Sequence, residues 1–252
     1  MRTKTIVLSV SLFGLSMFCS NLSLAGSPHK VESHGVTLHV LQEAMLEKLH
    51  SGKYRMRATE ITVEPGHVLS TSTYPGPSMA YIFEGTVVSI EHGIQHEHRA
   101  GEGAAALESG RWRYKNEGDS QLRLVIFELI ASTQASVNKK DVANGKGHVM
   151  LDKEIDIPKT GQKLILVHGT IEPGGSAGEH THQGSEMRLL LAGSLTMTMP
   201  EKTVTYRKGQ YFFEPAHTHM TKVEGDRSTP TEFIIFEVGT ATDVDSVYHP
   251  ES

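Results

Sequence analysis

The sequence predicts an all-β protein made of two consecutive copies of one barrel unit. From Tyr54 onward, short runs rich in β-branched and aromatic residues alternate with turns that carry Gly, Pro, Asn or Asp, as in TEITVEPG, AYIFEGTVVSIEHG and KLILVHGTIEPG. Short strands at such spacing are typical of β-sandwiches and β-barrels. Similar segments also recur at a nearly constant distance along the chain. The fold class therefore depends on strand patterning and on an internal repeat.

The internal repeat relates the two halves of the chain by a nearly constant offset. The segment VEPG that begins at Val63 corresponds to IEPG, which begins at Ile171. Farther on, VIFEL at Val125 corresponds to IIFEV at Ile234, where the offset is larger by a single position, so one net insertion separates the halves. A repeat that persists in this way indicates a tandem duplication of one β unit.

The repeat defines the expected domain organisation. The segment from Ala131 to His148 is polar and has no hydrophobic periodicity, which is typical of a linker. We expect a signal peptide over residues 1–25, a first barrel over 26–131, a linker over 132–153 and a second barrel over 154–252.

A short helix is expected before the first barrel. Leu41, Met45 and Leu49 recur at helical spacing, and Gly52 is a plausible helix stop.

The composition is that of a globular protein without nucleic-acid-binding character. The 252 residues include 24 Lys and Arg against 29 Asp and Glu, for a net charge of -5, and no basic run is present. Binding of a phosphate backbone requires clustered positive charge, so nucleic acid is excluded as a partner. The sequence also has no Ser-His-Asp order, no Gly-rich phosphate loop and no nucleophilic cysteine of a hydrolase or nucleotide-binding enzyme.

The first 25 residues have the pattern of an export signal. Arg2 and Lys4 precede a short apolar run, and SLA ending at Ala25 has the small residues that a signal peptidase recognises. The apolar run is short for a bilayer-spanning helix, so cleavage near Ala25 is favoured over an uncleaved anchor. The one cysteine, Cys19, lies in this segment, so the mature chain would have no disulfide. We expect a secreted or periplasmic protein without stable membrane insertion.

Three residues of the second repeat have the spacing of metal ligands. His180 and His182 are two residues apart, so on a strand their side chains share a face, roughly 6–7 Å apart along the backbone. Imidazoles placed in this way can converge on one ion. Glu186 joins them only if the intervening segment QGS makes a turn. His217 and His219, which follow Pro215, are the candidates for a fourth ligand.

This stretch resembles the first sequence motif of the cupin superfamily. In GGSAGEHTHQGSEMRLLLAG, the defining positions are Gly174, His180, His182, Glu186 and Gly193. The resemblance implies a double-stranded β-helix (jelly-roll-type) barrel, two per chain, with the metal inside the mouth of the second barrel.

The segment GQYFFEPAHTH, from Gly209 to His219, resembles the second cupin motif with two departures. His217 stands where the family has glycine, and the last histidine comes one residue early. The resemblance implies that His180, His182, Glu186 and His219 bind one divalent transition metal, which is Fe, Mn, Ni, Cu or Zn. His217 is the alternative fourth ligand or a residue that supports the ligands.

The first repeat lacks these ligands. The offset between Val63 and Ile171 places Ser72, Tyr74 and Ser78 at the positions of His180, His182 and Glu186, with Arg111 or Trp112 at the position of His219. The first barrel has therefore lost the metal site, or has replaced it with a pocket for an organic molecule that involves Tyr74, Arg111 and Trp112.

The resemblance implies an exported metal-dependent enzyme that acts on a small oxygenated or carboxylate-bearing molecule. Dioxygenase-type oxidation is the first expectation, followed by lyase or isomerase chemistry. Arg188 or His217 would position the substrate or move a proton. Arg188 shares the strand face of Glu186, so it either clamps a substrate carboxylate or pairs with an internal acid.

A non-enzymatic protein that binds a metal or a small molecule is the alternative, because cupins share one fold among many functions. Cupins also associate through strand edges, so a homodimer is expected.

Overall fold

The computed structural model describes residues 32–46, 49–70, 76–91, 94–106, 113–133, 146–157, 162–240 and 247–248. These residues form strands and no helix, which confirms the all-β class. No helix in this part of the chain has the length and hydropathy needed to cross a membrane. The expected signal peptide lies outside the described residues, as do Ser72, Tyr74, Arg111 and Trp112.

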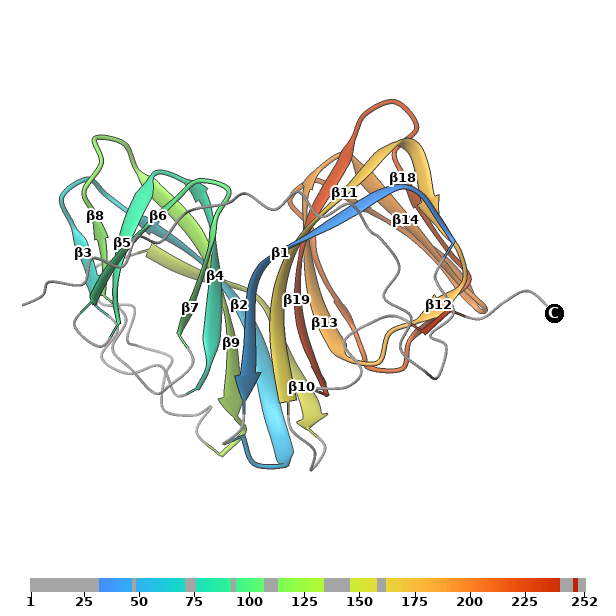
Figure 1. Ribbon diagram of the computed structural model, residues 1–252, viewed down its shortest axis with the longest axis horizontal. Coiled ribbons are helices and arrows are strands. Elements are labelled where there is room, and N and C mark those ends of the chain that lie inside the picture. Colours follow the sequence, from blue (N-terminus) through green and yellow to red (C-terminus); the bar gives the residue numbers. More distant parts are fainter. Residues whose placement is uncertain are drawn as a thin grey trace, which may run out of the picture.

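The first barrel combines two sheets of the described residues (Figure 1). A five-stranded sheet has the order β10-β2-β9-β4-β7, and a four-stranded sheet has the order β3-β8-β5-β6. The strands of the larger sheet are β2 (Gly52–Val63), β4 (Ser78–Glu84), β7 (Gly103–Ala106), β9 (Leu122–Ala131) and β10 (Lys146–Ile157). The strands of the smaller sheet are β3 (Val68–Ser70), β5 (Thr86–Glu91), β6 (Ile94–Arg99) and β8 (Arg113–Asn116).

The second barrel is a curled eight-stranded sheet of the described residues, with a three-stranded sheet of order β17-β12-β20 at its mouth. The large sheet runs in the order β15-β14-β18-β11-β19-β13-β16, and β1 joins it through β11. Its strands are β1 (Ser33–Leu46), β11 (Gln162–Ala177), β13 (Ser185–Ala192), β14 (Ser194–Met199), β15 (Lys202–Arg207), β16 (Tyr211–Glu214), β18 (Lys222–Gly225) and β19 (Thr231–Thr240). The small sheet contains β12 (His180–Thr181), β17 (His219–Met220) and β20 (Val247–Tyr248).

The duplication is visible in the strand register of the two barrels. Ser78 on β4 lies opposite Glu128 on β9, and Glu186 on β13 lies opposite Glu237 on β19, at the positions that the repeat equates. A β-bulge follows Val40 in β1, and another follows the equivalent residue of the repeat, Val149 in β10. Bulges at equivalent positions show that the repeat extends to local backbone geometry. The structure therefore has the two tandem barrels that the sequence predicts.

The two barrels exchange strands. The strand that precedes each barrel in the sequence joins the sheet of the other barrel. β1 pairs with β11 of the second barrel, and β10 pairs with β2 of the first barrel. Residues 134–145 of the expected linker lie outside the described residues, and the segment from Lys146 onward forms β10. The repeat alone did not predict this exchange of strands.

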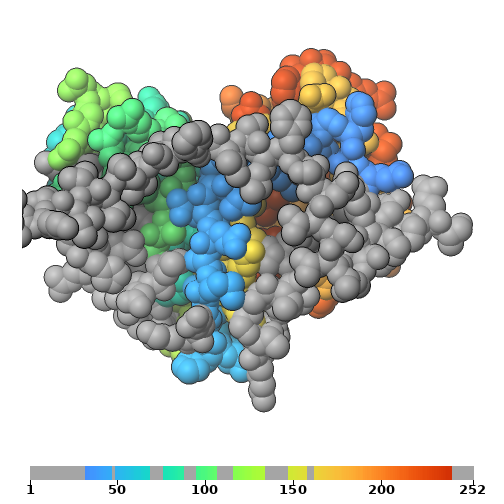
Figure 2. All heavy atoms as spheres, in the orientation of Figure 1, coloured from blue at the N-terminus to red at the C-terminus, as the bar shows by residue number. Residues whose placement is uncertain are grey.

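The helix expected around Leu41, Met45 and Leu49 is wrong. Leu41 and Met45 lie in β1, which pairs with β11 along most of its length. Ladder hydrogen bonds to a long partner strand outweigh a weak local preference for helix. Figure 2 shows this segment, in blue, on the surface over the second barrel and in the middle of the molecule. Leu38 and Met45 of β1 are exposed.

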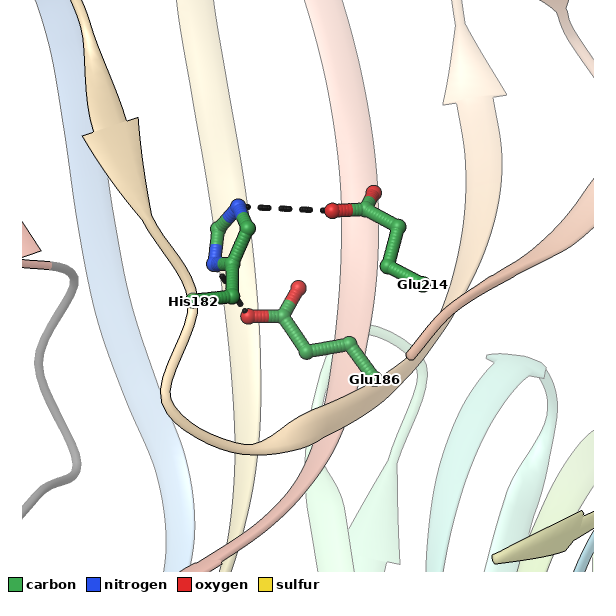
Figure 3. Close-up of side chains that lie close together, drawn as sticks. All are labelled: His182, Glu186 and Glu214. Atoms are coloured by element: carbon green, nitrogen blue, oxygen red, sulfur yellow. Dashed lines mark ion pairs between the residues drawn. The ribbon is translucent and has the colours of Figure 1, made fainter. Parts of the chain in front are cut away.

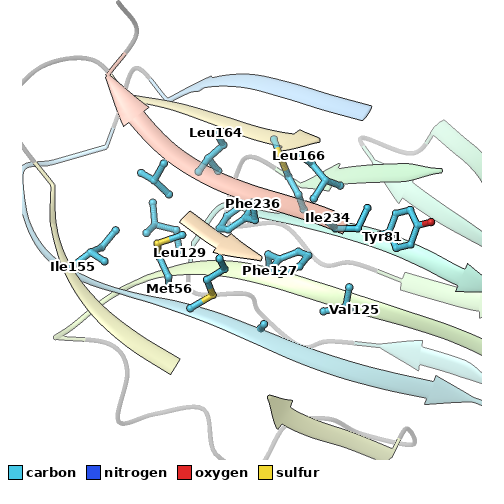
Figure 4. Close-up of a cluster of buried hydrophobic side chains, with 14 of the residues drawn as sticks. Met56, Tyr81, Val125, Phe127, Leu129, Ile155, Leu164, Leu166, Ile234 and Phe236 are labelled. Atoms are coloured by element: carbon cyan, nitrogen blue, oxygen red, sulfur yellow. The ribbon is translucent and has the colours of Figure 1, made fainter. Parts of the chain in front are cut away.

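The two barrels pack against each other through a shared apolar core (Figure 4). Met56, Phe127 and Leu129 of the first barrel meet Leu164 and Phe236 of the second. The rings of Phe127 and Phe236, which occupy equivalent positions of the repeat, are stacked with centroids 5.3 Å apart. This core lies between the large sheets of the two barrels. The interior of each barrel contains a separate apolar core.

Candidate metal centre

His180 and His182 converge at the mouth of the second barrel. Their Nε2 atoms are 3.2 Å apart, and both side chains are buried. His180 Nδ1 lies 2.7 Å from the carbonyl oxygen of Gly178. Because a carbonyl only accepts, this nitrogen carries the proton, and the lone pair of Nε2 faces His182. The backbone thus fixes the tautomer that a metal-binding imidazole needs.

The chain turns sharply after His182 and returns as β13. A Cβ at Gly184 would lie 2.6 Å from the carbonyl oxygen of Val238, so the close approach of the turn to β19 requires glycine. The turn places Glu186 Oε1 2.7 Å from His182 Nδ1. The QGS segment therefore brings the carboxylate alongside the imidazole, as the predicted ligand spacing requires.

Glu214 is a further ionisable group at this point, and it is not among the ligands predicted from the sequence. It lies on β16 directly opposite Glu186 and is buried. One of its oxygens is 3.3 Å from His182 Nε2, so the imidazole lies between two carboxylates (Figure 3). The signal in the sequence is that Glu214 is two residues after the core residue Phe212 and therefore shares its inward face.

Arg188 is buried beside the two carboxylates. Its guanidinium lies 2.6 Å from Glu186 and 3.0 Å from Glu214, and Nη2 lies 3.3 Å from His182 Nε2. Of the two alternatives drawn from the sequence, the structure has Arg188 paired with internal acids. A buried guanidinium between two carboxylates offsets part of the cost of removing their charge from water.

The charges of this group are strongly coupled. Burial opposes ionisation of Glu186, but the charges of Arg188 and His182 outweigh it and hold the pKa of this carboxyl well below its ordinary value. Burial raises the pKa of Glu214. Burial also lowers the pKa of His180 to about 4, with a further contribution from the charge of His182. His180 is therefore neutral at physiological pH, as a metal ligand must be.

His219 is not brought to His180 and His182. In the pairing of β12 with β17, Thr181 lies opposite His219, so both point to the opposite face from His180. His219 Nδ1 lies 3.2 Å from the hydroxyl of Thr181, and Nε2 lies 2.9 Å from Glu179 Oε1. Both ring nitrogens of the expected fourth ligand are thus engaged away from the buried group.

His217 contributes its backbone to the site. Its φ of 64° is in the left-handed region, which explains why the cupin motif has glycine at this position. Its N–H donates to the carbonyl oxygen of His182 at 2.7 Å, and its side chain is exposed. The residue on the same face as His180 in β17 is Met220, which is fully buried.

The buried donors fit a divalent cation. Ligand atoms of His182, Glu186 and Glu214 lie within 4.8 Å of one another, and His180 Nε2 borders the same point. Both oxygens of Glu214 are buried without a well-directed hydrogen bond. Arg188 and His182 pair with this carboxylate by charge, but its oxygens keep lone pairs that no hydrogen bond uses and that a bound cation could take. Mixed imidazole and carboxylate donors suit Fe, Mn or Zn in particular.

Comparisons with known proteins agree with this geometry. Residues 167–236, which include both histidines and all three charged residues of the group, match the family model described as Cupin domain. No curated protein sequence matches the chain.

Solved structures show the same fold at low sequence identity. AerE from Microcystis aeruginosa has a TM-score of 0.53 at 15% identity, over 79% of this chain and 98% of that one. Salicylate 1,2-dioxygenase from Pseudaminobacter salicylatoxidans has a TM-score of 0.52 at 11% identity, over 72% and 70%. A mutant oxalate decarboxylase of Bacillus subtilis has a TM-score of 0.52 at 15% identity, over 81% and 78%. The last two are cupin-fold proteins. Residues 167–236 of the second barrel therefore contain a cupin domain, and the chain has the fold of two tandem cupin barrels.

Proposed function

We propose that the chain is a metal-dependent enzyme whose second barrel acts on a small oxygenated or carboxylate-bearing molecule. The observation that carries the proposal is the buried group of His180, His182, Glu186 and Glu214, in which the Glu214 carboxylate has no well-directed hydrogen bond. Oxidation by dioxygen is the first reaction class, and lyase or isomerase chemistry is the second. The two enzymes among the solved structures support this class because salicylate and oxalate are small acids.

The ligand set proposed for the metal combines the sequence prediction with the geometry. His180, His182 and Glu186 are retained, and Glu214 replaces His219 as the fourth donor. A divalent ion bound there would supply Lewis-acid activation of an oxygen-bearing group or a site for dioxygen.

Arg188 acts as a positioning residue in this proposal. Its ion pairs hold the Glu186 and Glu214 carboxylates toward His182 and keep their mutual repulsion low. The Glu186 carboxylate in turn accepts from His182 Nδ1, so it orients this imidazole with Nε2 toward His180. We further propose that the protein works in the periplasm or outside the cell, after removal of the segment that ends near Ala25.

The test combines metal analysis with an activity panel on the purified full chain. We expect about one divalent ion per chain, and metal-dependent turnover of at least one substrate in a panel of small phenolic acids, enols and dicarboxylates, followed by oxygen uptake and chromatography. The variants His182→Ala and Glu214→Gln are expected to lose the metal and the turnover together, whereas His219→Gln keeps both.

Stable metal binding without turnover of any substrate would instead establish a non-enzymatic binding protein. Metal retention in Glu214→Gln together with metal loss in His219→Gln would refute the proposed ligand set.

A further inference from the structure

A row of polar side chains crosses the large sheet of the first barrel. Asp152 lies opposite Arg57, Arg57 lies opposite Glu128, Glu128 lies opposite Ser78, and Ser78 lies opposite Ala106. Directly opposed residues on neighbouring strands have their side chains on one face. The row therefore joins β10, β2, β9, β4 and β7, which are neighbours in the sheet (Figure 1), on one side of that sheet. Ser78 is the repeat equivalent of Glu186, so the row lies at the level that the metal group occupies in the second barrel.

The row faces the interior of the first barrel. Ala80 and Ile126 belong to the buried core of this barrel. Ser78 and Glu128 are each two positions away on the same strands, so they share that face, and Arg57 shares it through its pairing with Glu128. Ser78 is fully buried and Glu128 is 7% exposed. The first barrel thus has an interior that is apolar at one level and charged at the next.

One wall of this interior has much smaller side chains than its counterpart in the second barrel. The wall is formed by β4 and β7, which correspond to β13 and β16. The equivalent residues are Ser78 for Glu186, Ala80 for Arg188, Ala104 for Phe212 and Ala106 for Glu214. In the first barrel, small side chains that bind no metal thus stand in place of the two carboxylates, the guanidinium and the phenyl ring of the second barrel.

Two hydrogen-bond donors of the row have no acceptor. Ser78 Oγ is buried without a partner, and so is Arg57 Nε. The nearest carboxylate oxygen to Arg57 Nε is on Asp152 at 3.6 Å, which is too long for a hydrogen bond, and the other oxygen of Asp152 accepts from Arg55 at 2.8 Å. A buried donor left without an acceptor loses its hydrogen bond to water and gains none in return, which is unfavourable. Two such donors beside a wall of alanines are the features of a built site for an acceptor group.

We propose that the first barrel binds a small carboxylic acid, with its carboxylate on Arg57 and Ser78 and its hydrocarbon part against Ala104 and Ala106. The proposal concerns the other barrel and is independent of the proposed function. A carboxylate matches a guanidinium and a hydroxyl donor, and an apolar ring or chain matches the alanine wall.

The charges that face the row are compatible with an anion. Arg55 and Arg57 carry two positive charges, and Asp152 carries one negative charge. Burial raises the pKa of Glu128 to about 7, the charge of Arg57 opposing this effect, so a large part of this carboxyl is neutral near neutral pH and presents a donor. The charges of Arg57 and Asp152 then balance within the row, and Arg55, which lies beside the row and pairs with Asp152, adds one positive charge.

The test is calorimetric titration of the purified full chain with benzoate and with benzamide, which has the same ring and no charge. We expect benzoate to bind one to one and benzamide to bind roughly tenfold more weakly or worse. Arg57→Gln and Ser78→Ala are expected to weaken benzoate binding by about tenfold or more, and Ala106→Leu to block it by filling the wall. Thermal melting of each variant checks that the barrel is folded. Ser78→Ala removes only one hydroxyl group, so it is the variant expected to disturb the fold least.

Two controls assign the binding to the first barrel. Arg123 on β9 is exposed on the opposite face, where it lies over the ring of Phe83, so Arg123→Gln should bind benzoate like the wild type. Glu186→Gln alters the second barrel and should also leave benzoate binding unchanged. The inference is overturned by equal binding of benzoate and benzamide, by wild-type affinity in Arg57→Gln and Ser78→Ala, or by loss of binding in Glu186→Gln. Absence of benzoate binding up to about 10 mM overturns it as well.

Discussion

A shift of one residue decides which side chain faces His180 across β12 and β17. His180 lies opposite Met220, so the thioether occupies the face on which the cupin motif places its last histidine. His219 lies on the other face, with Thr181 and Glu179. In the sequence this histidine comes one residue early relative to the cupin motif, and the period of two in a strand turns this shift into a change of face.

The variant Met220→His tests this alternation. The new imidazole would start from a fully buried position on the face of His180, so we expect metal affinity to rise by roughly tenfold or more. Competition with a fluorescent chelator measures the change. The matched variant Thr218→His places an imidazole on the neighbouring turn, where a smaller effect is expected. An unchanged affinity in Met220→His would show that this face does not point to the metal.

Glu128 gives the first barrel a measurable pH dependence. Its pKa is about 7 in the folded protein against an ordinary value of 4.5, so the unfolded chain loses this proton first as pH rises. The free energy of unfolding should therefore fall between about pH 4.5 and pH 7, by about 3 kcal/mol at most, and level off above that. The variant Glu128→Gln lacks this titrating group. Its free energy of unfolding should therefore increase relative to that of the wild type as pH rises from about 5 to about 8.

Urea unfolding at both pH values measures this difference, and the other titrating groups cancel in the comparison between wild type and variant. A constant difference between the two proteins across this range would contradict the account of Glu128.

At the level of elements, strand alternation and the repeat predicted most of the fold, and the metal histidines were predicted to share a face. Strand partners could not be predicted in the same way. The helical spacing of Leu41 and Met45 gave no sign of β11 as a partner, because this pairing joins segments that are far apart in the sequence. Glu214 was missed for a related reason, since its place opposite Glu186 appears only when the register of β13 and β16 is known.

The exchange of β1 predicts that the start of the chain stabilises the second barrel. A chain that begins at residue 49 lacks β1 and leaves one edge of β11 without its partner. We expect this chain to melt at a lower temperature and to lose metal binding, although every proposed ligand is present. A peptide of residues 33–46 is expected to restore part of the thermal stability and part of the metal binding. Thermal melting and metal analysis provide the measurements. Wild-type metal content and melting temperature in the shortened chain would show that β1 is dispensable.

For the molecule as a whole, the shared core between the barrels predicts a single cooperative unit. Phe127 and Phe236 are both fully buried and stacked, and β1 and β10 add a strand from each half to the sheet of the other. Phe127→Ala should cost about 3–5 kcal/mol and should lower the stability of the metal-binding second barrel as much as that of the first. Calorimetry is expected to give one transition for both proteins. Two separate transitions in the wild type would contradict the shared unit.

The most direct measurement of the metal centre is anomalous X-ray scattering from crystals of the full chain grown with manganese. We predict one strong anomalous peak in the second barrel, within bonding distance of His180, His182, Glu186 and Glu214, and no peak at His219. A peak bonded to His219 instead of Glu214, or Arg188 still bridging the two glutamates with no peak beside them, would contradict the account.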